Sequence, residues 1–120
     1  MSANTAPNFE YISDVTGFRA PNAFVARLGG PLRRKRDLLR ALAGCLKLPD
    51  YFGYNWDALE ECLRDLSWLP NDKTIILLHE QSPLADERQR ATYIDILRSA
   101  QQDQRGRLRV VFPVKSANEV

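Results

Sequence analysis

The residues of this 120-residue chain that could do chemistry are concentrated between residues 48 and 65. Asp57, Glu61 and Asp65 recur at a spacing of four, so on a helix their carboxylates form one stripe. Four aromatic residues precede this stripe or overlap its start: Tyr51, Phe52, Tyr54 and Trp56. One short loop cannot bury all four rings. Exposed aromatic rings beside carboxylates are typical of a protein-binding site for a basic partner.

The same residue types also allow other interpretations. On composition alone, the simplest interpretation of the acidic stripe is a solvated helix face. Asp57 and Glu61 also suggest a glycosidase or metal site, but two acids one helical turn apart with no third ligand are weak support for either. His79 and the cysteines Cys45 and Cys62 lack the regular spacing of a zinc site. We expect the cysteines to be small core residues.

Two further features have both a functional and a structural interpretation. The basic run Arg33–Arg36 could bind nucleic acid or an acidic partner, yet four adjacent cations on a helix point in four directions, which favours a solvated face. His79 ends an apolar run with no nucleophile near it in sequence, so we expect a capped or surface histidine rather than a catalytic base. We assign no catalytic residue.

The expected secondary structure places these residues in an α/β fold. The periodicity predicts strands over 23–28, 74–79 and 107–112, and helices over about 33–46, 56–67 and 83–102. A short strand near Phe9–Ile12 is also indicated. Thr74–His79 is almost entirely apolar, as in a central strand covered on both faces. The order of elements predicts a small three-stranded parallel sheet packed with three or four helices, with Asn55 as the N-cap of the second helix.

Composition and charge limit the class of protein. The chain is 44% hydrophobic and 27% charged, which fits one globular domain, and no apolar run approaches the roughly 20 residues of a membrane helix. Its start lacks the features of a signal peptide, so we expect a cytoplasmic protein without membrane attachment. The net charge of +2 hides a segregation, because residues 48–87 contain nine acidic and only two basic side chains. The middle of the chain can therefore present a local negative field.

The segment LPDYFGYNWDALEECL, residues 48–63, strongly resembles the signature of the barstar family, small intracellular inhibitors of secreted barnase-type ribonucleases. The shared pattern is Leu-Pro, an acid, Tyr, an aromatic, Gly, any residue, Asn, an aromatic or Leu, and Asp-Ala-Leu, with an acid four residues after that Asp and then Cys-Leu. The family's fold agrees with the expected element order, which predicts a barstar-like domain over residues 21–115 after an N-terminal extension over residues 1–20.

The resemblance implies a role for each matching position. Tyr51 would pack over the catalytic histidine of the nuclease, while Gly53 and Asn55 would shape the loop. Asp57 and Glu61 would reach the arginine and lysine side chains that normally hold RNA phosphate. The protein would therefore be a non-enzymatic inhibitor of a basic barnase-like ribonuclease and a monomer when unbound. It would have no small-molecule substrate, cofactor or metal.

The sequence also departs from the family pattern. Glu61 stands where barstar has Asp, Glu60 replaces a Trp, and the outlying family glutamate falls at Ser99, with Asp103 one turn later. We therefore expect a cognate nuclease other than barnase itself. The predicted interface is Tyr51, Gly53, Tyr54, Asn55, Trp56, Asp57, Glu60, Glu61 and Asp103. The alternative is an adaptor of the same fold that binds a non-nuclease protein or, through Arg33–Arg36, nucleic acid.

Overall fold

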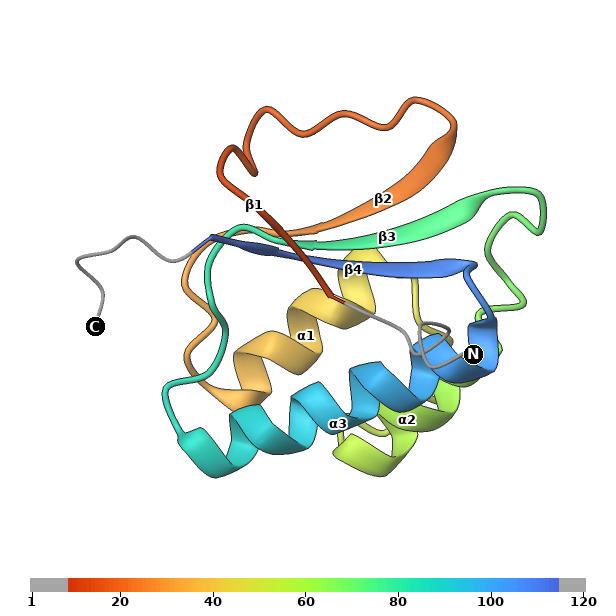
Figure 1. Ribbon diagram of the computed structural model, residues 1–120. Helices are drawn as coiled ribbons and strands as arrows, with labels where there is room; N and C mark the ends of the chain where they lie inside the picture. The colour runs from red at the N-terminus through yellow and green to blue at the C-terminus, as the bar shows by residue number, and fades with distance from the viewer. Residues whose placement is uncertain (1–8, 115–120) are drawn as a thin grey trace, which may run out of the picture.

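The computed structural model describes residues 9–114, which form three helices and one parallel sheet (Figure 1). In chain order the elements are β1 (Glu10–Ile12), β2 (Ala23–Leu28), α1 (Lys35–Cys45), α2 (Trp56–Asp65), β3 (Thr74–His79), α3 (Glu87–Gln104) and β4 (Leu108–Pro113). The strands of this part of the chain are arranged β1-β4-β3-β2, and each pair is parallel. The predicted α/β class is confirmed.

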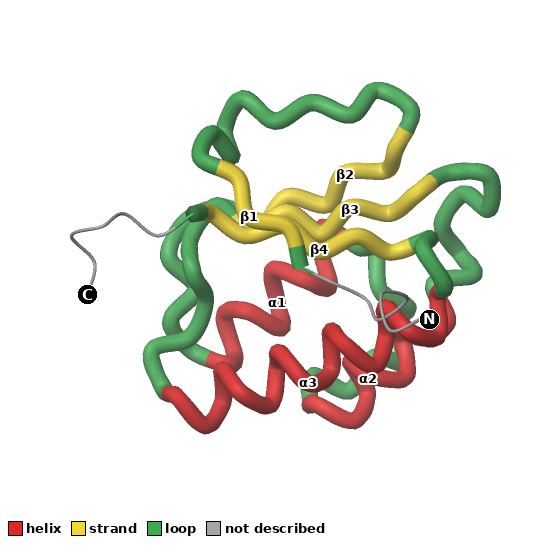
Figure 2. The backbone as a smooth tube through the Cα atoms, viewed as in Figure 1, coloured by secondary structure: helices red, strands yellow, loops and turns green. Residues whose placement is uncertain are grey.

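The sheet lies between two layers of different kinds. The three helices cover one face, and the segment 13–22 runs across the other (Figures 1 and 2). Successive side chains of β3 point to opposite faces. Ile75 and Leu77 join the main core under the helices, while Ile76 and Leu78 join a smaller core under that segment. The prediction that this strand is covered on both faces is confirmed.

The predicted number of strands is wrong, because β1 adds a fourth strand to the sheet beside β4. This is the short strand indicated near Phe9–Ile12. The carboxylate of Glu10 accepts hydrogen bonds of 2.7 and 2.8 Å from Arg109, and the ring of Phe9 meets that of Phe112 edge-on, with the centroids 5.5 Å apart. Residues 1–8 of the predicted extension, and residue 115 of the predicted domain, lie outside the described residues.

The helix expected over 83–102 begins later, at Glu87. Asp86 caps it by accepting a hydrogen bond of 3.0 Å from a backbone N–H of the first turn. The residues before the cap are held elsewhere, since the N–H of Leu84 donates to the carbonyl of Leu32, at 2.8 Å, in the loop that leads into α1. This contact between loops prevents the helix from extending back to Pro83.

We expected a capped or surface histidine at position 79; the surface alternative is wrong, because His79 is buried at the end of β3. Its Nδ1 lies 2.9 Å from the carbonyl oxygen of Val111, and its Nε2 lies 2.8 Å from the hydroxyl of Tyr93. A carbonyl can only accept, so Nδ1 carries the proton and Nε2 accepts from the tyrosine. Burial lowers the pKa of His79 from 6.5 to about 4, which keeps the ring neutral.

Candidate protein-binding site

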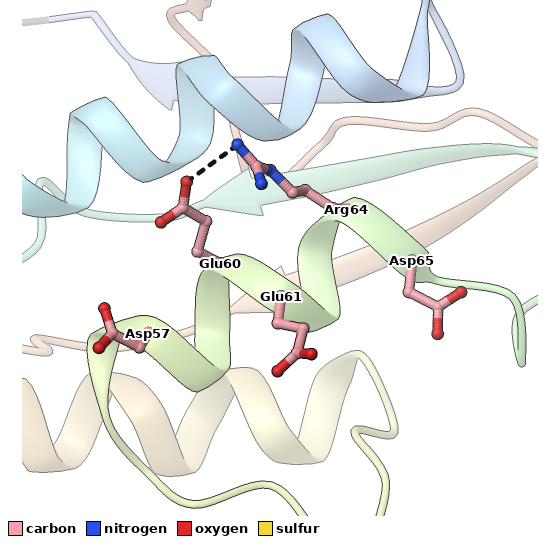
Figure 3. A pocket seen from close by; sticks show the side chains of 5 residues that line it. All are labelled: Asp57, Glu60, Glu61, Arg64 and Asp65. Carbon is pink, nitrogen blue, oxygen red and sulfur yellow. Dashed lines mark ion pairs between the residues drawn. The ribbon is translucent and has the colours of Figure 1, made fainter.

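Helix α2 separates an apolar side from an acidic side. Its buried residues are Leu59, Cys62 and Leu63, and the helix packs against α3. Asp57, Glu61 and Asp65 are all exposed, as their spacing of four predicts. We call these three residues the acidic stripe (Figure 3). The helix therefore uses one side for the core and leaves the other available for contact.

The start of α2 is fixed by the residue predicted to cap it. The side-chain oxygen of Asn55 accepts a hydrogen bond of 2.8 Å from the N–H of Ala58. Its amide nitrogen lies 3.3 Å from the carbonyl oxygen of Gly53, to which it donates. A Cβ at position 53 would approach that nitrogen to 3.1 Å, so a side chain there would crowd the cap. The motif Gly-x-Asn thus sets where the acidic stripe begins.

The end of α2 is held by two side chains that the sequence did not point to. The amide nitrogen of Gln104 lies 2.8, 2.9 and 3.3 Å from the carbonyl oxygens of residues 63–65. The guanidinium of Arg107 donates to the carbonyls of Leu66 and Pro70, at 3.1 and 3.0 Å. The last carbonyls of a helix lack partners within the helix, so the contacts of Gln104 satisfy groups that would otherwise need water, while Arg107 adds donors to the turns that follow the helix.

Arg64 divides the acids of this region into two sets. Its guanidinium lies 3.3 Å from the carboxylate of Glu60 and 2.9 Å from that of Asp103 on α3, and Figure 3 shows it turned toward α3. The acidic stripe forms no ion pair within residues 9–114. Two of the predicted interface acids, Glu60 and Asp103, therefore share one cation, which offsets one of their two negative charges. The carboxylates of the acidic stripe have no such cation within residues 9–114.

The acidic stripe borders a shallow hollow of about 430 Å³. The hollow is lined by Asp57, Glu60, Glu61, Arg64 and Asp65 (Figure 3). Its negative field extends beneath the surface to Cys62: burial raises the pKa of this thiol most, and the charges of Glu61 and Asp65 raise it further. A cationic side chain entering the hollow would relieve the repulsion between these carboxylates.

The aromatic loop, residues 51–56, divides its rings between the core and the solvent. Phe52 is buried, and Trp56 is half-buried with its ring 6.1 Å from that of Tyr93. Tyr51 is 76% exposed and Tyr54 is 55% exposed. Two of the four rings therefore anchor the loop, and the other two face solvent next to the first carboxylate of the stripe.

Tyr54 has an unusual backbone, with φ at 55° in the left-handed region. A bulky residue adopts this conformation only where its surroundings enforce it, at a cost of about 1–3 kcal/mol. Its ring lies against that of Phe52, with the centroids 4.8 Å apart. Such strain collects at binding and catalytic sites.

The structure brings together the predicted residues from Tyr51 to Glu61 on one loop and one helix.

The third helix contributes less than the sequence suggested. Ser99 is half-buried, and Asp103 reaches α2 only through Arg64. The i,i+4 spacing of Glu60 and Arg64 was a readable signal for their ion pair. No signal in the sequence connects Arg64 with Asp103, or Gln104 with the end of α2, because the folded chain alone brings those residues together.

The alternative interpretations gain no support from the described residues. Within residues 9–114 no group of three or more His, Cys, Asp or Glu side chains could hold a metal ion. Cys62 is buried and Cys45 half-buried, both are free thiols, and burial raises the pKa of Cys45 to about 12. No helix in this part of the chain is long and apolar enough to cross a bilayer.

The comparison with known families fits the geometry of loop and helix. A search of curated proteins finds no match to this chain. A family model does match, over residues 23–114, and it is described as Barstar (barnase inhibitor). This match spans β2 to β4, including the capped helix, its acidic stripe and the aromatic loop before it. With its parallel sheet, its helices on one face and the motif at residues 48–63, the chain belongs to the barstar family.

Proposed function

We propose that this protein inhibits a basic, barnase-like ribonuclease by inserting the aromatic loop and the acidic stripe into the nuclease's active-site cleft. The observation that carries the proposal is a set of three carboxylates that follow two exposed tyrosines and have no ion-pair partner among residues 9–114. Membership of a family described as barnase inhibitors supports the same conclusion.

The proposed chemistry is mimicry of RNA phosphate. A nuclease binds phosphodiesters with arginine and lysine side chains, and carboxylates can accept the same charge-assisted hydrogen bonds. Asp57 lies in the first turn of α2, which the Asn55 cap fixes, and the positive end of the helix dipole stabilises its negative charge. Glu61 lies one turn further along the same side. Tyr51 supplies a large exposed ring that can cover an apolar or aromatic surface of the cleft.

The ion pairs of Arg64 assign different roles to the predicted acids. Asp103 joins α3 to α2 through Arg64, and Glu60 pairs with the same arginine within α2, so we expect both acids at the rim of the complex. Asp57 and Glu61 are the residues that we expect to contact the nuclease's cations directly. Glu61 is one methylene longer than the Asp of the family pattern and loses more rotamer entropy on binding, so its position favours a nuclease whose cations lie deeper in the cleft.

The test is inhibition of a panel of purified barnase-like ribonucleases, measured at low and high salt. We expect tight inhibition of at least one member, weakened by salt. Asp57→Asn and Glu61→Gln should each weaken it by about 2 kcal/mol, because each leaves a cation of the nuclease buried without a partner. Asp72→Asn is the matched control, since Asp72 is an exposed acid in the loop between α2 and β3.

Two results would contradict the proposal. One is inhibition that Asp57→Asn and Glu61→Gln leave unchanged, which would remove the acidic stripe from the interface. The other is the absence of inhibition across the whole panel by protein that is shown to be folded. That second result would favour a partner outside this class of nuclease.

A further inference from the structure

A second hollow, of about 630 Å³, lies against the aromatic loop and has the opposite charge. It is lined by Lys35, Arg36, Leu39, Arg40 and Tyr54. We call it the basic groove. Its floor is apolar, since Leu39 is buried, and its walls are three cations and the exposed ring of the loop. The predicted interface includes Tyr54 but none of these cations.

The start of helix α1 explains how the cations converge. The helix begins at Lys35, so Arg33 and Arg34 precede it, and only Lys35 and Arg36 of the basic run belong to the helix. Positions 35, 36, 39 and 40 share one helical face. Arg40 therefore joins Lys35 and Arg36 one turn later. Arg33 lines a different hollow, whereas Lys35 and Arg36, although adjacent on the helix, both line this one.

Contacts with the aromatic loop fix one side of the basic groove. The ammonium of Lys35 lies 5.1 Å from the centre of the Trp56 ring, a cation–π contact that joins α1 to the start of α2. Tyr54 is held by its left-handed backbone and by its contact with Phe52. The groove therefore borders the loop that leads, three residues after Tyr54, to Asp57 at the start of the acidic stripe.

The three cations share the start of α1 with one acid, Asp37. Lys35, Arg36 and Arg40 form no ion pair within the part of the chain that the structure describes. Neighbouring like charges repel each other, and the helix N-terminus adds positive potential to the same place. A ligand bearing carboxylates or phosphates would relieve this repulsion. The aromatic wall and the apolar floor add surface that such a ligand can bury.

We propose that the basic groove binds an acidic segment of the cognate nuclease, next to the cleft that the acidic stripe enters. This inference rests on the proposed function. A protein segment fits better than RNA, because a phosphate chain leaving the groove past Tyr54 would meet the carboxylate of Asp57 and then that of Glu61. A folded protein can instead present carboxylates to the groove and cations to the stripe.

The consequence is discrimination among nucleases. A nuclease whose surface is basic all around its cleft would be attracted by the stripe but repelled by Arg36 and Arg40. A nuclease with acids beside the cleft would be attracted by both surfaces. Specificity often depends on such a repulsive element as much as on the attractive contacts. The groove would therefore select the cognate enzyme from among related basic nucleases.

The experiment uses the double variant Arg36→Gln/Arg40→Gln against the nuclease that the protein inhibits most tightly. We expect inhibition to weaken roughly tenfold, with slower association at low salt. The same variant should inhibit wholly basic members of the panel better than the parent does. Arg19→Gln is the control, since Arg19 is exposed and lies in the segment that crosses the other face of the sheet.

The outcomes separate this inference from the proposed function. Inhibition that Asp57→Asn weakens but Arg36→Gln/Arg40→Gln does not would overturn the inference and leave the proposed function standing. Failure of the parent protein to inhibit any panel member would overturn both. Binding of a fluorescein-labelled single-stranded RNA at physiological salt, lost in the double variant, would assign the groove to nucleic acid and also overturn the inference.

Discussion

Acidification should destabilise this protein in two separate steps, and the first depends on His79. The neutral ring donates from Nδ1 to the carbonyl of Val111 and accepts at Nε2 from Tyr93, while Phe112 stacks on it with ring centroids 4.2 Å apart. A proton added at Nε2 would face a hydroxyl already used as a donor and would place a charge in the core. For this reason, burial lowers the pKa of His79 from 6.5 to about 4.

The size and sign of the effect follow from linkage. Between pH 6.5 and 4 the unfolded chain binds a proton at His79 that the folded protein does not, so the free energy of unfolding decreases as the pH falls through this window. The complete loss is about 3 kcal/mol. About 2 kcal/mol of it should be lost between pH 7.5 and pH 5. The second step involves Glu10, whose pKa is lowered by its hydrogen bonds with Arg109, and begins only near pH 4.5.

The assay is urea denaturation at pH 7.5, 6 and 5, followed by tryptophan fluorescence. The reference is His79→Leu/Tyr93→Phe, which replaces the titrating ring and its hydroxyl partner by apolar groups and should show little dependence on pH in this range. Equal stability of the parent protein at pH 7.5 and pH 5 would refute the reasoning. So would a pKa near 6.5 for His79, measured by NMR in the folded protein.

Two further substitutions test the contacts that hold α2. Gln104→Ala should lower the free energy of unfolding by about 1 kcal/mol, because it frees the carbonyls of residues 63–65, and a matched Gln104→Met, which keeps the apolar stem, should show whether the amide is responsible. Arg64→Met should cost less than about 1 kcal/mol in a urea titration, since both of its ion pairs are half-exposed. The same variant should associate faster with a basic nuclease in stopped-flow measurements, as Glu60 and Asp103 become unpaired.

Much of the fold could be predicted because its signals are local. The apolar run Thr74–His79, the cap at Asn55 and the two-sided pattern of α2 each depend on residues within one or two helical turns, and each is found as expected. The acidic stripe was predicted for the same reason. In a helix with 3.6 residues per turn, side chains spaced by four point to the same side of the helix.

The features that sequence reasoning missed depend on partners distant in the chain. The short strand near Phe9–Ile12 was indicated, but its pairing with β4, about 100 residues later, was not, and the contact of Glu10 with Arg109 accompanies that pairing. His79 becomes a core residue because Tyr93, a full element later, supplies a hydroxyl partner to a ring that is otherwise costly to bury. The basic groove was missed because it depends on Tyr54 lying beside α1. Contacts of this kind exist only in the folded chain and produce no periodic pattern in the sequence.

Two conflicts with local preference lie where we place the binding site. Along the acidic stripe, both i,i+4 pairs join like charges and cost a few tenths of a kcal/mol each, although a cation at position 61 would make both attractive. Three residues before the stripe, Tyr54 holds a left-handed backbone that glycine would adopt without strain. Nearby, Glu60 and Asp103 both pair with Arg64. On a surface that meets only solvent, nothing would favour unpaired like charges and a strained backbone beside acids that are paired with a cation. A surface that binds a basic partner must keep its carboxylates unpaired, since each carboxylate paired within the protein is one fewer for the nuclease.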